Sequence, residues 1–157
     1  MNEFLKNKLV KAVLTGLACL VAVYALIYTD VVLRARSAYL EGEKYWAWNE
    51  DPKLKEAGIA QWYQKEKLAL DKEHSGNKIT KDEFDRRLEL LDFTKDRKLR
   101  ESSIKYAYVW YQTAVELFSP PDSKWVKLSR EKMPKAKELW RKELTDKKIP
   151  FEEYMLE

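Results

Sequence analysis

The segment with the most chemistry-bearing side chains is "DKEHSGNKITKDEF", residues 71–84, which is similar to a calcium-binding loop between two helices. An EF-hand loop needs oxygen ligands at loop positions 1, 3, 5 and 12 and glycine at position 6. Counting from Asp71 places Gly76 at position 6, but Lys78 and Asp82 then fall on positions 8 and 12. Counting back from Glu83 as position 12 instead places Lys72 and His74 on positions 1 and 3, where oxygen ligands are needed. A sensor with a degenerate EF-hand-like turn at 71–83 is therefore an alternative hypothesis.

The same residues also form ordinary helix boundary signals. Thr80 and Glu83 have the spacing of a capping box, in which each residue satisfies a free backbone amide at a helix start. Ile79 and Phe84 flank the cap at the positions of a hydrophobic staple. The pattern predicts a helix that begins at Thr80.

The preceding helix is expected to end at Gly76 and Asn77, two residues that suit the left-handed backbone of a helix end. The stretch "GNKITKDEF", residues 76–84, resembles the short helical hairpin motif called SHOCT. In this chain the stretch lies in the middle of the sequence. We expect a helix–turn–helix joint here.

Residue types that support catalysis or metal binding are scarce elsewhere. His74 and Cys19 are the only histidine and cysteine, so one chain cannot supply a zinc ligand cluster or an internal disulfide. With four glycines, no phosphate-binding loop can be written, and Gly-x-Ser-x-Gly and His-Glu-x-x-His are absent from the sequence. His74 is expected on the solvated surface. We expect a protein that is not an enzyme, with no catalytic residues, cofactor, metal or evident small-molecule substrate.

Aromatic residues concentrate in residues 102–125, which have apolar stripes on two sides of a predicted helix. Such a helix is typically the centre of a core. Because aromatic side chains also concentrate binding energy at interfaces, the candidates for partner binding are Tyr106, Trp110 and Trp125. Resting on the membrane interface is a third interpretation. An exposed Trp110 would favour the binding interpretation.

An uncharged run, "AVLTGLACLVAVYALIYT" at residues 12–29, is long enough to cross a bilayer as a helix. Leu9 and Val10 extend it, so a transmembrane signal anchor is predicted at 9–29, after a short basic segment at 1–8. A cleaved signal peptide ending near "VYA", residues 23–25, is one alternative, and a lipoprotein with "GLAC" as a poor lipobox is another. The apolar run continues past both sites, which favours an uncleaved single-pass anchor.

Flanking charges set the expected orientation. Lys6, Lys8 and Lys11 precede the span, and Arg34 and Arg36 follow it. The slight bias predicts a cytoplasmic N-terminus and an extracytoplasmic C-terminal domain, periplasmic in a Gram-negative cell. The net charge of +4, with both signs interspersed, does not indicate nucleic acid binding.

The remaining residues predict helices throughout. The membrane helix is expected to run on to about Trp48, and Asp51 and Pro52 begin the next one. A break near residues 95–103 is expected to divide the long stretch 81–118, and "SPPD" at 119–122 ends it. Pro134 is expected to kink or divide a last helix from about Ser123. The predicted parts are a helical domain at 30–148 and a docking tail at 149–157.

The expected fold is all-α, with one N-terminal transmembrane helix followed by a compact helical-hairpin bundle of about four to five helices. The expected function is that of a membrane-anchored scaffold or accessory subunit that binds a protein partner. The expected partners are the membrane and a protein or membrane complex.

Overall fold

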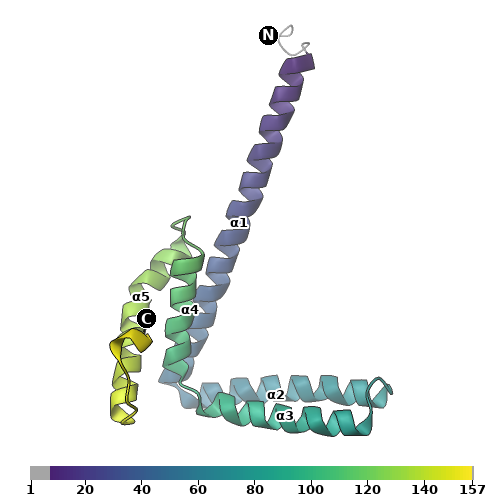
Figure 1. The fold of residues 1–157 in the computed structure, drawn as a ribbon, viewed down its shortest axis with the longest axis vertical. Coiled ribbons are helices and arrows are strands. Elements are labelled where there is room, and N and C mark those ends of the chain that lie inside the picture. Colours follow the sequence, from purple (N-terminus) through teal and green to yellow (C-terminus); the bar gives the residue numbers. More distant parts are fainter. Residues whose placement is uncertain (1–7, 157) are drawn as a thin grey trace.

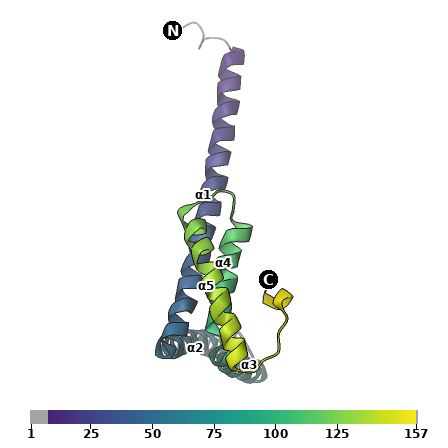
Figure 2. The ribbon, with the colours of Figure 1, turned by 90° about the vertical axis from the view of Figure 1, so that its left-hand side faces the viewer.

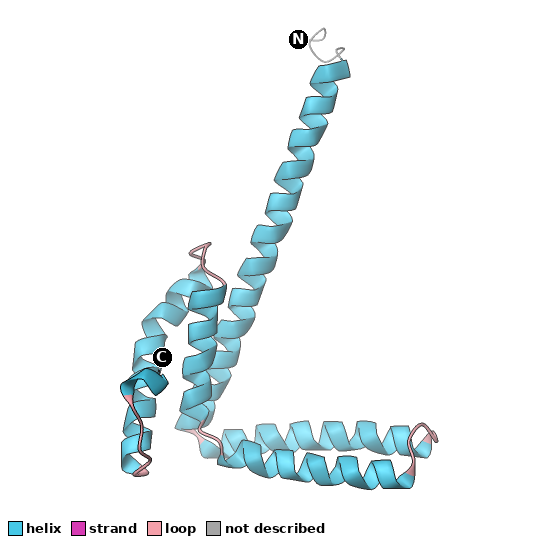
Figure 3. Cartoon of the chain, viewed as in Figure 1, coloured by secondary structure: helices cyan, strands magenta, loops and turns pink. Residues whose placement is uncertain are grey.

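The computed structural model describes residues 8–156, and all of the regular structure in that part of the chain is helical. Five α-helices and one short 3₁₀ turn follow one another along the chain, which confirms the all-α prediction (Figure 3). Nearly all of the predicted basic segment at 1–8 lies outside the described residues.

Helix α1 is a single helix of 43 residues, Lys8–Glu50. At 1.5 Å per residue it is about 65 Å long. Its first half extends alone beyond the rest of the molecule, and residues 11–30 are all exposed (Figure 1). This half is the one stretch of the described chain that is long and apolar enough to cross a membrane, a pattern that signal sequences share. The predicted border between anchor and domain at residue 30 therefore lies inside a continuous helix.

The second half of α1 packs with α4, Ser103–Leu117, and α5, Lys124–Asp146 (Figures 1 and 2). Small residues let the three helices approach closely, and the core also takes larger side chains from α4, α5 and the C-terminal 3₁₀ turn. The fully or nearly fully buried alanines are Ala35, Ala38, Ala107, Ala114 and Ala136, and the large core residues are Ile104, Tyr108, Tyr111, Trp140 and Leu156.

Helices α2, Pro52–Ser75, and α3, Lys81–Arg100, form an antiparallel hairpin that projects sideways from the end of this bundle (Figure 1). We call this hairpin the arm. Ile59 and Leu70 are the buried residues of α2. The structure describes every residue of α3, and none of them is buried. The helical bundle is thus formed by α1, α4 and α5, and the arm lies outside it rather than completing a compact bundle.

Polar caps set the helix boundaries. Asp51, Thr80, Ser102 and Ser123 each have extended backbone and accept a hydrogen bond from an amide in the following turn. The predicted starts at Asp51, Thr80 and Ser123 are confirmed. The predicted break in the stretch 81–118 is confirmed at Glu101 and Ser102, where the chain turns from the arm back into the bundle.

The last described residues pack on the bundle. Helix α5 is continuous through Pro134, and the loop after it leads back to a 3₁₀ turn, η2, at Glu153–Leu156 (Figure 3). Leu156 is fully buried in the core cluster, and Glu153 forms an ion pair of 2.8 Å with Arg141 of α5. These contacts hold the last residues against α4 and α5.

Candidate functional site

A polar network joins the three helices of the bundle. The Tyr111 hydroxyl on α4 donates to Glu43 Oε1 on α1 at 2.5 Å, and Lys132 Nζ on α5 donates to both Glu43 carboxylate oxygens at 2.7 Å. The Lys132 ammonium also lies 5.2 Å from the Trp46 ring centroid. One carboxylate therefore ties together all three helices.

Burial is the main cause that raises the pKa of Tyr111, and its hydrogen bond to Glu43 adds to the effect. The phenol keeps its proton at neutral pH, so it is not an activated nucleophile. Sequence reasoning missed this network. The available signal was the position of Glu43 between residues that face the bundle, Tyr39 and Trp46, on the same helix.

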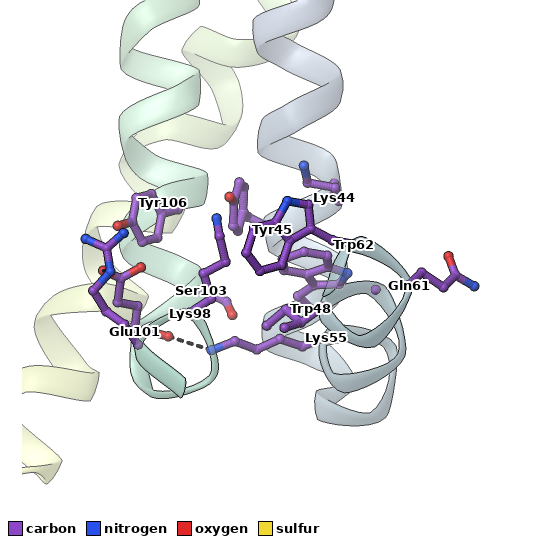
Figure 4. Close-up of a pocket in the computed structure, with 13 residues that line it drawn as sticks. Lys44, Tyr45, Trp48, Lys55, Gln61, Trp62, Lys98, Glu101, Ser103 and Tyr106 are labelled. Carbon is purple, nitrogen blue, oxygen red and sulfur yellow. Dashed lines mark hydrogen bonds and ion pairs between the residues drawn. The ribbon is translucent and has the colours of Figure 1, made fainter. Parts of the chain in front are cut away.

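A cavity of about 410 Å³ lies at the corner where the bundle meets the arm (Figure 4). Residues from the end of α1, the start of α2, the end of α3 and the start of α4 line it. Tyr45 stacks on Tyr106 with ring centroids 5.2 Å apart, and the edge of Trp48 meets Tyr45 at 5.1 Å. Trp62 of the arm completes the aromatic lining.

Gly58 makes this corner possible. A Cβ added at Gly58 would come within 2.6 Å of Cζ2 of Trp48. Because glycine has no side chain, the Trp48 indole lies directly against α2 and forms part of the cavity wall.

The three predicted partner-binding residues are separated along α4 and α5. Tyr106 and Trp110 are both half-buried. Tyr106 lines the cavity, whereas Trp110 lies one helical turn further along α4 and does not line it. Trp125 lies at the start of α5, with its ring 5.6 Å from the Tyr39 ring and 5.6 and 5.5 Å from the cations of Arg36 and Lys124. The structure therefore brings Tyr106 into a cavity and places Trp125 at the opposite end of the bundle.

At the 71–83 turn, acidic side chains pair with arginine. The Arg87 guanidinium donates to Glu73 on α2 at 2.9 Å, across the two helices of the arm, and to Glu83 on its own helix at 2.5 Å. Glu83 also donates its backbone amide to Thr80 Oγ1 at 3.3 Å, which is one half of the expected capping box. Among the described residues, no group of three or more acidic, histidine or cysteine side chains is placed to hold a metal ion.

Two details of this turn differ from the predictions. Gly76 has φ of −82°, so Asn77, with φ of 54°, is the residue with left-handed backbone. His74 is half-buried rather than solvated, because its ring stacks on Phe84 with centroids 4.7 Å apart. The stacked pair joins the last turn of α2 to the first turn of α3 at the tip of the arm.

No protein-family model, curated protein or solved structure matches the chain. The resemblance of residues 76–84 to the short helical hairpin motif therefore gives no family assignment.

Proposed function

We propose that this chain is a non-enzymatic, single-pass membrane protein whose helical domain acts as a scaffold or accessory subunit and binds a protein partner. The first half of α1 would be the membrane anchor. The bundle would hold the arm at a fixed place relative to the bilayer.

The continuity of α1 supports the anchoring part of the proposal. Residues 11–30 are exposed and apolar apart from their ends, whereas Ala35 and Ala38 of the same helix are buried in the bundle. Exposed apolar surface of this extent is stable in a lipid environment and unfavourable in water. The slight excess of lysine before the span supports a cytoplasmic N-terminus and an extracytoplasmic domain.

The observation that carries the partner-binding part is the exposed apolar surface of the arm. Leu90 and Phe93 lie one turn apart on α3 and are 62% and 57% exposed. They line a shallow surface hollow together with Arg86 and Glu89. Because isolated helical hairpins with few buried residues are marginally stable, a partner that covers α3 would stabilise the arm.

Native purification tests the subunit assignment. The full-length protein is extracted from its native membrane in mild detergent, and the mass of the intact complex is measured by native mass spectrometry. We expect one companion protein in fixed stoichiometry, lost when Leu90→Lys and Phe93→Lys are combined. The matched control is Leu40→Lys, a bundle position on α1 that is 47% exposed, which should keep the companion. A chain that purifies alone, or a companion equally lost in the control, would refute the proposal.

A labelling experiment tests the orientation. Cys19 is replaced by serine, and Asp85→Cys introduces a thiol on the exposed side of α3. A membrane-impermeant maleimide should label intact cells as completely as permeabilised cells. Labelling that appears only after permeabilisation would place the domain in the cytoplasm.

A further inference from the structure

The corner cavity combines flat aromatic walls with an excess of positive charge. Its charged lining residues are Lys44, Lys55, Arg97 and Lys98 against the single carboxylate of Glu101. An uncharged aromatic cleft would not select between ligands of different charge. This cleft has a built-in preference for an anion.

Two of the lysines lie over the aromatic rings. Lys44 Nζ is 4.8 Å from the Tyr45 ring centroid and 5.4 Å from that of Trp48. Lys98 Nζ is 5.0 Å from the Trp62 centroid, and Figure 4 shows its side chain directed into the space beside Trp62 and Tyr45. A flat ligand that contacts these rings would therefore have a lysine ammonium group close to it.

The other cations of the lining already have partners. Lys55 Nζ donates to the carbonyl oxygens of Leu99 and Glu101 at 2.9 and 2.6 Å. Arg97 Nε lies 3.8 Å from Glu101 Oε1. Lys44 is paired with Glu41, which does not line the cavity. Lys98 is therefore the lining cation best placed to meet a ligand.

The location of the cavity relative to the bilayer rests on the proposed function: with the first half of α1 as the membrane anchor, the cavity lies outside the bilayer. Lys44 follows Thr29, the last residue of the uncharged run, by fifteen residues of continuous helix. This spacing corresponds to about 22 Å along the axis, beyond the headgroup layer. A ligand must therefore arrive from the aqueous side.

We propose that this cavity is a binding site for a small, water-soluble organic anion with a flat aromatic body and a carboxylate or phosphate group. The aromatic body would lie among Tyr45, Trp48 and Trp62 and meet their rings by face or edge, and the acidic group would pair with Lys98. Because the walls come from both the bundle and the arm, the bound anion would fix the arm against the bundle. The site does not depend on the proposed protein partner or on the membrane orientation.

Calorimetric titration of the full chain in lipid nanodiscs tests this site. The probes are 2-naphthoate and 2-naphthyl phosphate, and the charge-reversed control is 2-naphthylmethylammonium. Empty nanodiscs supply the blank for partition into lipid. We expect saturable binding of at least one anion, with one molecule per chain, and no saturable binding of the cation.

Two lysine variants locate the binding. Lys98→Gln should weaken binding of the anion by about tenfold, as expected for the loss of one charge-assisted contact. The matched control is Lys95→Gln, because Lys95 lies on the same helix, 4.8 Å from the Tyr63 ring, but outside the cavity. Failure of both anions to bind, equal binding of the cation, or equal weakening by the two variants would each overturn the proposal.

Discussion

Replacing Gly42 by alanine tests how closely the bundle is packed. Gly42 is buried on α1, and a Cβ added there would lie 2.5 Å from Cε1 and 2.7 Å from Cδ1 of Tyr111. Ordinary carbon–carbon contacts are about 3.5 Å or more, so the ring would have to move by about 1 Å. The Tyr111 ring has little freedom to move, because it is fully buried and its hydroxyl is bonded to Glu43.

Two opposing effects determine the change in the free energy of unfolding. Alanine in a helix interior is favoured over glycine by about 0.8–1.0 kcal/mol. Overpacking a well-filled core costs about 1–3 kcal/mol. We expect the cost of overpacking to exceed the gain in helix propensity at Gly42. The free energy of unfolding should fall by about 1 kcal/mol and the Tm by about 4 °C.

Tryptophan fluorescence provides the assay. All six tryptophans follow residue 45 in the sequence, so the signal during heating of the full chain in detergent reports the bundle and arm. The control is Gly16→Ala, where an added Cβ meets no described heavy atom within 4 Å. This variant adds no clash, so it should not lower the transition temperature.

A double-mutant cycle tests the cause. If the Tyr111 ring is the obstacle, then Gly42→Ala should stabilise a Tyr111→Leu background by up to about 1 kcal/mol, because only the helix propensity remains. The reasoning is refuted if Gly42→Ala does not destabilise the natural chain, or if it costs the same amount in both backgrounds.

Three other predictions concern single residues. Ser102→Ala should lower the free energy of unfolding by about 1 kcal/mol in thermal melts, because the Ser102 hydroxyl caps α4. Ser102→Thr should keep most of this stability, because threonine also caps helices. Lys55→Met should speed amide hydrogen exchange in the last turn of α3, because the ammonium group bonds two carbonyls there; unchanged exchange would contradict this role. The raised pKa of Tyr111 means that its contribution to stability is constant below about pH 10, where unfolded tyrosine begins to ionise, and falls as pH rises above it. Tyr111→Phe should flatten this alkaline decrease in Tm, and an equal decrease in both proteins would exclude Tyr111 as its source.

Local signals predicted the helices and most of their ends. Asp51, Thr80 and Ser123 are caps that act within one turn, so the sequence around them is sufficient. The exception at Gly76 and Asn77 arose because both residues tolerate left-handed backbone, and sequence alone did not choose between them.

The placement of the arm could not be predicted in the same way. The apolar residues of α2, such as Trp62 and Leu70, are compatible with a compact bundle, because an apolar stripe does not specify which helix covers it. The structure pairs α2 along its length with α3 and brings only its start against α1, and the cavity then arises from residues as distant in sequence as Lys44 and Tyr106. The stacking of Tyr45 on Tyr106 is a tertiary contact with no local signal, so Tyr106 was identified as a site residue only by its residue type.

The continuous helix α1 also fixes a direction. Each residue of an α-helix turns the chain by about 100° and advances it by 1.5 Å. One residue inserted between Thr29 and Arg34 would therefore swing the arm by more than a quarter of a circle relative to the apolar half of α1, with almost no change in height. The number of residues between Thr29 and Arg34 thus sets the direction in which the arm points, relative to any neighbour that packs on the first half of α1.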